Sequence, residues 1–270
     1  MISKLKTKIS KNIKNSKMSI AKKSNKKYNK KNNQQNSVRY LIKLDEVWKT
    51  YKVGTVSIHA LRGLNFKVKE GEFVAIMGPS GSGKSTAVNM IGCLDIPTKG
   101  KIYLDGHDIS KLEESELAQI RGRKIGFIFQ KFNLIQTLTA LENIMLPMIF
   151  QNTPSATRIK KAVELLKIVE LEDRMHNKPT ELSGGQQQRV AIARALANDP
   201  EIILADEPTG NLDSKTGKIV MDFLRKLHNE GRTIIMVTHD KDIAKYAERI
   251  DYLKDGVIIK SEVNKKFTAL

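Results

Sequence analysis

A glycine-rich segment around residue 80 has the residue types and spacing that bind phosphate groups. Gly78 is followed after four residues by Gly83, Lys84 and Ser85. This spacing places the backbone N–H groups of a loop and a helix N-terminus around a phosphate, because the helix dipole favours anions there. We expect Lys84 to reach the β- and γ-phosphates of a nucleotide and the Ser85 hydroxyl to bind Mg²⁺. The candidate binding residues are Gly78, Pro79, Ser80, Gly81, Ser82, Gly83, Lys84, Ser85 and Thr86.

Two carboxylates follow an apolar segment further along the chain. Ile202–Ala205 is apolar throughout, and Asp206 and Glu207 come directly after it. A carboxylate at the end of a buried strand can bind Mg²⁺, and its neighbour can polarise an attacking water. The alternative is a pair that only caps the turn before Pro208. The phosphate-binding spacing favours the catalytic reading, with Asp206 on the metal and Glu207 as the base.

A third segment, Leu182–Gln186, has the sequence Leu-Ser-Gly-Gly-Gln and precedes a predicted helix. Ser183, Gly184 and Gly185 therefore form a second helix N-terminus that can accept an anion. An ordinary N-cap explains the serine but not the whole string.

Three single residues gain meaning only beside these segments. Gln130 ends the apolar run Ile125–Phe129, and His239 follows the apolar run Ile234–Thr238. Tyr51 is an aromatic residue that can stack on a base. Each also has a structural reading, as a strand end, a capping histidine or a strand aromatic.

The basic charge of the chain is concentrated at its start. The 270 residues carry 47 Lys and Arg against 29 Asp and Glu, a net charge of +18. Residues 1–39 hold 12 Lys, one Arg and no acidic residue. The remainder holds 47 − 13 = 34 basic against 29 acidic residues, a net charge of only +5, so the charge alone does not indicate a nucleic-acid-binding body. Residues 1–39 are too poor in apolar residues to bury a core, and we expect a basic disordered tail.

Other classes of protein are excluded by what the sequence lacks. No continuous apolar h-region follows the first lysines, so the tail does not resemble a signal peptide. No run of about 18 apolar residues predicts a membrane-spanning helix. The single cysteine, Cys93, excludes an intrachain disulfide framework.

The order of strand and helix patterns predicts an α/β fold. Phe73–Met77 is a continuous apolar run before the glycine loop, as expected for a strand buried on both faces. Further strands are predicted at 41–44, 64–68, 101–104, 125–129, 202–205 and 233–237. Helices are predicted at 85–94, 139–150, 158–169, 185–197 and 214–229. Alternating strands and helices favour a mostly parallel sheet, and residues 131–185 are predicted to form a helical insertion in a domain spanning 40–270.

Together these segments resemble the ATP-binding subunit of ABC transporters. The resemblance covers residues 41 to about 262 and is read position by position. Gly78–Thr86 looks like Walker A, Gln130 like the Q-loop glutamine and Leu182–Gln186 like the signature. Asp206 looks like the Walker B aspartate, Glu207 like the catalytic glutamate, Asn211–Asp213 like the D-loop, His239 like the switch histidine and Tyr51 like the aromatic that stacks on adenine.

Wider strings resemble one branch of this family, the macrolide-export and lipoprotein-releasing ATPases. They are Leu61–Gly63, Gly92–Asp95, Arg123–Gln130 and Leu138–Ile144. Related cell-division and amino-acid-import ATPases share much of this pattern.

The resemblance implies a phosphate-loop, RecA-like, mostly parallel core with an N-terminal antiparallel β subdomain and an α-helical insertion. It implies a head-to-tail homodimer around two ATP molecules, each held by the Walker A of one subunit and Ser183, Gly184, Gly185 and Gln186 of the other. ATP and Mg²⁺ are the implied substrate and cofactor, with Ser85, Gln130 and Asp206 at the metal. Glu207, His239 and Gln130 are the implied catalytic residues, and Asp213 the D-loop contact.

The implied partner is a separate integral membrane permease, reached from the cytoplasmic face of the cell membrane. Its docking groove is expected between the core and the helical insertion, within 131–141, at Phe132, Leu134, Ile135 and Leu138. The alternative is that these residues pack inside the helical subdomain. We expect a solvated, disordered tail. The alternative is a basic helix on an anionic membrane surface, because apolar residues of the tail fall at helical spacing among lysines. Two rival functions remain: a soluble ABC-type ATPase acting on RNA or ribosomes through the tail, and a non-enzymatic nucleotide-binding scaffold. Nucleic acid is the less expected partner, because the chain has one ATPase module and no long coiled-coil insertion.

Overall fold

The computed structural model describes residues 39–265 and 267 of the chain. The predicted basic tail, residues 1–39, therefore lies outside the described part except for Arg39. Arg39 forms ion pairs with Glu70 (2.9 Å) and Asp105 (2.6 Å).

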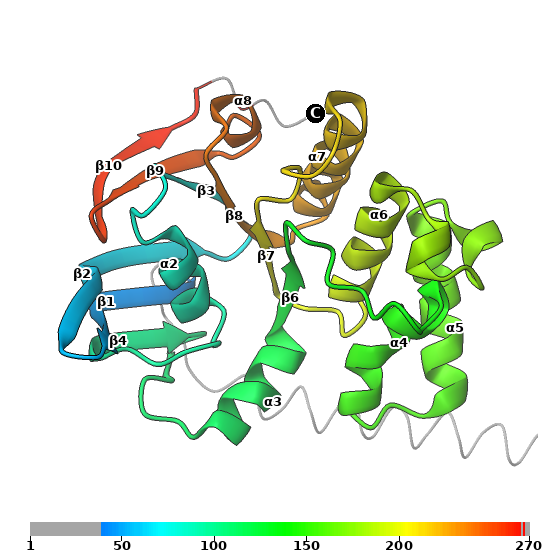
Figure 1. Cartoon of the computed structure of the whole chain (residues 1–270), viewed down its shortest axis with the longest axis horizontal. Helices are drawn as coiled ribbons and strands as arrows, with labels where there is room; N and C mark the ends of the chain where they lie inside the picture. The colour runs from blue at the N-terminus through cyan, green and yellow to red at the C-terminus, as the bar shows by residue number, and fades with distance from the viewer. Residues whose placement is uncertain (1–38, 266, 268–270) are drawn as a thin grey trace, which may run out of the picture. The chain divides into compact units, whose positions relative to one another are not determined.

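An antiparallel sheet begins the described chain (Figure 1). Its strand order is β2-β1-β4-β5, with β1 at Tyr40–Val53, β2 at Val56–Lys69, β4 at Lys99–Leu104 and β5 at His107–Asp108. β1 and β2 form a long hairpin in which Val53 pairs with Val56, so the turn contains only two residues. This sheet confirms the predicted antiparallel β subdomain.

A second sheet of six strands has the order β10-β9-β3-β8-β7-β6. Its strands are β3 (Phe73–Met77), β6 (Ile125–Ile128), β7 (Ile202–Asp206), β8 (Thr233–Thr238), β9 (Arg249–Lys254) and β10 (Val257–Val263). All neighbouring pairs are parallel except β9 and β10. The predicted mostly parallel α/β core is therefore confirmed.

One helix follows the glycine loop, three lie in the long connection between β6 and β7, and the others connect further strands in the described part of the chain. They are α2 (Lys84–Ile91), α3 (Glu114–Lys124), α4 (Ala140–Phe150), α5 (Ser155–Ile168), α6 (Gly184–Ala195), α7 (Ser214–Asn229) and the short α8 (Lys241–Ala244). Single 3-10 turns lie at Glu172–Arg174 and Pro179–Glu181. α4, α5 and the start of α6 fall in the stretch predicted as a helical insertion; its status as a separate subdomain stays a prediction.

The second sheet is buried on both faces, because its strands send alternate residues into two cores. In β3, Phe73 and Met77 join the core formed with α4 to α7, whereas Val74 and Ile76 join the core shared with the first sheet and α2. Figure 1 shows the first sheet and the group of α4, α5 and α6 at opposite sides of β7 and β8. This explains why the strands read as continuous apolar runs rather than alternating ones.

Candidate functional site

Four adjacent parallel strands end at the same edge of the second sheet, and each is followed by a predicted site residue. β3 leads into Gly78, β8 into His239 and β7, through Asp206, into Glu207; Gln130 lies two residues beyond β6. The strands stand side by side in the order β3-β8-β7-β6. Segments far apart in sequence therefore meet at the carboxyl ends of parallel strands, where α/β folds bind ligands.

The glycine loop between β3 and α2 is shaped by residues that tolerate no side chain. A Cβ at Gly78 would lie 2.2 Å from the carbonyl oxygen of Leu253, and Gly83 has a φ of 100°. α2 begins without a side-chain cap and without an acidic residue in its first turn. The free N–H groups of that turn remain available to an anion. The loop thus fits a phosphate group.

Lys84 bends back over this loop. Its Nζ donates hydrogen bonds to the carbonyl oxygens of Gly78 (2.7 Å) and Pro79 (2.8 Å). The ammonium therefore lies over the loop that would cradle the phosphate. Among the described residues of this loop, Lys84 supplies the positively charged side chain. The adjacent Ser85 is exposed, which leaves its hydroxyl accessible to a bound cation.

Asp206 is a carboxylate in an environment that favours a bound cation. Burial raises the pKa of its side chain, the negative charge of Glu207 raises it further, and Lys84 partly lowers it. Within residues 39–265, no hydrogen bond or ion pair engages this carboxylate directly. A divalent cation between Asp206 and Ser85 would supply the missing positive charge, so the donor set fits Mg²⁺.

Glu207 and His239 form a hydrogen-bonded pair. Glu207 Oε1 lies 2.7 Å from His239 Nδ1 and accepts the backbone N–H of His239 at 3.1 Å. The Thr238 hydroxyl donates to Glu207 Oε2 at 3.3 Å. The Glu207 side chain is 15% exposed, whereas His239 is 70% exposed. The carboxylate is therefore oriented by three groups from the end of β8; sequence reasoning missed Thr238, because a threonine in an apolar strand gives no signal of its own.

Gln130 lies beside the segment that follows Glu207. Its backbone oxygen accepts a hydrogen bond from Asn211 Nδ2 (2.8 Å), and a Cβ on Gly210 would lie 2.7 Å from its Nε2. Tyr51 is half-buried; its hydroxyl donates to Asp95 (3.2 Å), and Lys49 Nζ lies 5.2 Å from its ring centroid. The structure thus brings Gln130 to the site, while stacking of Tyr51 on a base stays a prediction.

The Leu-Ser-Gly-Gly-Gln segment forms the N-terminus of α6. Ser183 Oγ accepts the N–H of Gln186 (3.3 Å), and Gln186 Oε1 accepts the N–H of Ser183 (2.9 Å), which makes a capping box. A Cβ at Gly184 would meet nothing closer than 3.7 Å, whereas a Cβ at Gly185 would lie 2.4 Å from Thr216 Cγ2. Gly184 is therefore dispensable for packing within one chain.

Asp213 is already used as a cap in the single chain. Its carboxylate accepts the Thr216 N–H (3.0 Å) and the Thr216 hydroxyl (2.6 Å) at the start of α7. The bond from the Thr216 hydroxyl is the main cause of a lowered pKa of Asp213. Neither Asp213 nor Ser183 has a hydrogen bond to the glycine loop within the part of the chain that the structure describes. Their nucleotide contacts remain predictions.

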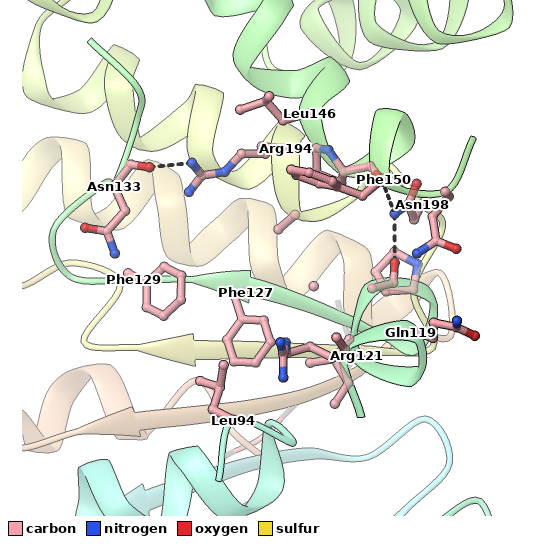
Figure 2. Close-up of a pocket in the computed structure, with 18 residues that line it drawn as sticks. Leu94, Gln119, Arg121, Phe127, Phe129, Asn133, Leu146, Phe150, Arg194 and Asn198 are labelled. Carbon is pink, nitrogen blue, oxygen red and sulfur yellow. Dashed lines mark hydrogen bonds between the residues drawn. The ribbon is translucent and has the colours of Figure 1, made fainter. Parts of the chain in front are cut away.

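A groove of about 620 Å³ opens among α3, β6, α4 and α6 (Figure 2). The rings of Phe127 and Phe129 stack along it at 5.5 Å, and the exposed Phe150 (78%) lies at its rim. Arg194 Nη1 donates to the Asn133 carbonyl oxygen at 2.5 Å, which holds the segment after Gln130 against α6. The apolar residues that line the groove include Leu94, Phe127, Phe129, Leu146 and Phe150.

The predicted docking stretch contributes only one residue to the lining of this groove. Leu134 is only 7% exposed and belongs to the core, so its proposed role in docking is wrong. Phe132 is half-buried and packs against the same core. Of residues 131–141, Asn133 lines the groove, and most of the remaining lining comes from α3, β6, α4, α6 and the residues next to them. An apolar run after a strand end could not show which of its residues turn inward.

Comparisons with known proteins agree with this geometry. The family model described as ABC transporter matches residues 61–210. An uncharacterized ABC transporter ATP-binding protein of Methanocaldococcus jannaschii, MJ0796, is 59% identical over 227 residues, covering 82% of this chain and 97% of that protein. The macrolide export ATP-binding/permease protein MacB of Brucella melitensis is 51% identical over 219 residues, covering 81% of this chain and 34% of that protein. The relatives thus include the predicted macrolide-export branch.

Solved structures of the cassette MJ0796 are similar to the described chain. One is a dimeric post-hydrolysis state bound to ADP and Pi, with a TM-score of 0.77 and 56% identity, covering 84% of this chain and all of that one. Another dimeric structure has the same TM-score at 57% identity. With the phosphate loop and the paired carboxylates in place, this chain belongs to the ABC transporter family, as an ATP-hydrolysing cassette whose substrate is ATP and whose cofactor is Mg²⁺.

Proposed function

We propose that two copies of this chain close head to tail around two MgATP molecules, and that hydrolysis drives a separate membrane permease. The observation that carries the proposal is the common edge of β3, β8, β7 and β6, at which the phosphate loop, His239, Asp206 with Glu207, and Gln130 come together. One chain thus holds a nearly complete hydrolytic site.

In this proposal Glu207 is the general base. Its carboxylate ends at the carboxyl edge of the sheet and is held by His239 and Thr238. A carboxylate so oriented can accept a proton from a water that attacks the γ-phosphate. His239 contacts the γ-phosphate from its exposed side and keeps Glu207 directed towards that water.

Four residues are proposed to hold Mg²⁺ and the phosphates. Lys84 exchanges its carbonyl partners for the β- and γ-phosphates. Asp206 and Ser85 bind the metal, with Gln130 as the further contact. When bound, Mg²⁺ would supply positive charge to the phosphate oxygens. The same charge would favour the ionised form of Asp206, whose pKa is otherwise raised. Tyr51 stacks on the adenine.

The second subunit is proposed to complete each site. At the N-terminus of α6, a Cβ at Gly184 would meet nothing closer than 3.7 Å, which leaves room for a ligand there. The positive end of a helix favours an anion. Ser183, Gly184, Gly185 and Gln186 would therefore contact the γ-phosphate bound to the other chain, with Asp213 beside them. The dimeric structures of MJ0796 support this assembly.

The groove in Figure 2 is proposed to receive a short segment of the permease at the cytoplasmic face of the membrane. An exposed Phe150 at the rim of an apolar groove fits an apolar helix from a partner. Among residues 39–265, no helix has the length and apolar character needed to cross a bilayer. The ATP-binding/permease architecture named for MacB supports a membrane partner. Export and a tail bound to anionic lipid stay predictions, and the tail lies outside the described residues.

Substitution of Glu207 tests the proposed base. Glu207→Gln keeps the size of the side chain but removes its capacity to take a proton. We expect unchanged ATP affinity by calorimetry and loss of phosphate release. Glu172→Gln is the matched control, because Glu172 is an exposed carboxylate in a separate turn. Phosphate release by Glu207→Gln at the rate of Glu172→Gln would contradict the role of Glu207.

A further inference from the structure

Glu207 has a backbone conformation that is unusual for a residue with a side chain. Its φ is 47°, in the left-handed region that residues other than glycine rarely adopt. Pro208 follows it, and a residue before proline has even fewer accessible conformations. A backbone of this kind persists only when its surroundings fix it.

Two hydrogen bonds hold the backbone of Glu207, and a third holds the next residue, Pro208. Glu207 N–H donates to the Val237 carbonyl oxygen (2.9 Å), and Gly210 N–H donates to the Glu207 carbonyl oxygen (3.0 Å). The third comes from a distant helix: Gln188 Nε2 donates to the carbonyl oxygen of Pro208 at 2.6 Å. Because Pro208 lacks an N–H group, its carbonyl is the backbone group through which it can be held in place.

Gln188 is an unusual residue for its position in α6. It is 0% exposed, yet its Oε1 has no hydrogen-bond partner. A methionine of similar size would fill the same space without leaving a buried oxygen unpaired. The packing of α6 alone therefore gives no reason for an amide here, whereas the bond to Pro208 does.

We propose that Gln188 is a positioning residue for hydrolysis, which holds Glu207 in its left-handed conformation through the Pro208 carbonyl. Gln188 lies one turn beyond Ser183 and Gly184 on α6. It therefore connects the N-terminus of α6, which is proposed to contact the partner subunit, with Glu207 in the site of its own chain. Movement of α6 when the dimer closes is then transmitted to Glu207. This inference rests on the role proposed above for Glu207.

The test compares Gln188→Met with wild type in the full-length chain. Methionine keeps the buried volume and removes the donor to Pro208. We expect ATP affinity and the unfolding midpoint to be retained, KM to be little changed and kcat to fall on the order of 10- to 100-fold, as for a displaced catalytic group. Asn264→Leu is the matched control, because Asn264 also donates its amide to backbone carbonyls, at Lys245 and Ala247, away from the site.

Gln188→Glu adds a readout that a structural role would not give. A protonated carboxyl donates to the Pro208 carbonyl as the amide does, whereas a carboxylate repels it. We therefore expect the ratio of kcat for Gln188→Glu to kcat for Gln188→Met to rise as the pH falls. Taking this ratio removes the titration of groups common to both variants, such as Glu207 and His239.

The outcomes separate this inference from the proposed function. Wild-type kcat in Gln188→Met, with an inactive Glu207→Gln, would overturn the inference and leave the proposed base intact. A loss of kcat accompanied by equal losses of ATP affinity and unfolding midpoint, without recovery in Gln188→Glu, would also overturn it. Hydrolysis by Glu207→Gln would instead remove the proposed base itself.

Discussion

Gly184 and Gly185 are neighbours in the sequence, but the structure gives them different reasons to be glycine. A Cβ at Gly184 would lie 3.7 Å or more from other atoms, an ordinary contact. A Cβ at Gly185 would lie 2.4 Å from Thr216 Cγ2. Thr216 cannot turn away freely, since its hydroxyl donates to Asp213. We therefore expect the two positions to respond to substitution in opposite ways.

For folding of the single chain, Gly184→Ala should raise the free energy of unfolding by about 0.4–1 kcal/mol, because it restricts the unfolded chain. Gly185→Ala should lower it by about 1–3 kcal/mol through overpacking against Thr216. Urea unfolding without nucleotide measures both values. Equal effects of the two substitutions would contradict the packing described here.

For assembly, Gly184→Asp should fold and bind ATP as well as wild type, since a carboxylate in the first turn suits the helix dipole. In the dimer that carboxylate would face the γ-phosphate held by the other chain. Two unit charges about 4 Å apart at an effective dielectric constant of ~20 repel by about 4 kcal/mol, a loss of roughly 1,000-fold in affinity per site. Sedimentation velocity with MgATP, in a Glu207→Gln background, measures this loss. A normal dimer of Gly184→Asp would refute the contact between subunits.

Three further substitutions test other parts of the site. Lys84→Ala should lose tight ATP binding in calorimetry, because Lys84 is the side-chain cation over the phosphate loop; unchanged affinity would remove it from the site. Asp206→Asn should abolish Mg²⁺-dependent hydrolysis yet stabilise the nucleotide-free protein at pH 7, because the raised pKa of Asp206 means that its ionised form opposes folding. The gain over wild type in urea unfolding should shrink as the pH falls through the folded pKa and Asp206 becomes protonated; a gain that grows on acidification would contradict the pKa shift. Phe150→Asp should keep the fold and basal ATPase but lose co-purification with the co-expressed membrane subunit, whereas Ile159→Asp, also exposed on the helical segment, should retain it; equal retention by both would place docking elsewhere.

Elements with strong periodic patterns were predictable from the sequence. The helix expected at 214–229 is α7, whose buried residues follow one face. The short, continuously apolar strands β3, β7 and β8 were also identified, because both of their faces are covered. In contrast, α3 was missed, because Leu117 is its only buried residue and no apolar stripe marks it.

The strand β9 escaped prediction for an electrostatic reason. It contains Asp251, which is 1% exposed and accepts hydrogen bonds from Arg249 (2.8 Å) and Ser261. A buried, paired aspartate interrupts the apolar pattern by which strands are recognised. β1 extends to Val53, well beyond the predicted 41–44, because its second half is partly exposed and alternates less clearly.

Site residues that belong to a continuous sequence motif were predictable. Residues whose role depends on contacts made in the folded chain were harder to predict. The phosphate loop and the carboxylates after β7 follow from local sequence. The Glu207–His239 bond joins residues 32 positions apart, and the bond from Gln188 to Pro208 depends on how α6 packs. No pattern in the sequence gives either contact.

The central claim is that ATP is bound between two chains and hydrolysed through Glu207. Sedimentation velocity of Glu207→Gln with MgATP, combined with counting of bound nucleotide, tests it most directly. The account predicts a species with twice the 30.4 kDa mass of one chain, holding one ATP per chain, that does not form with ADP. A particle that stays monomeric while fully loaded with ATP would contradict it.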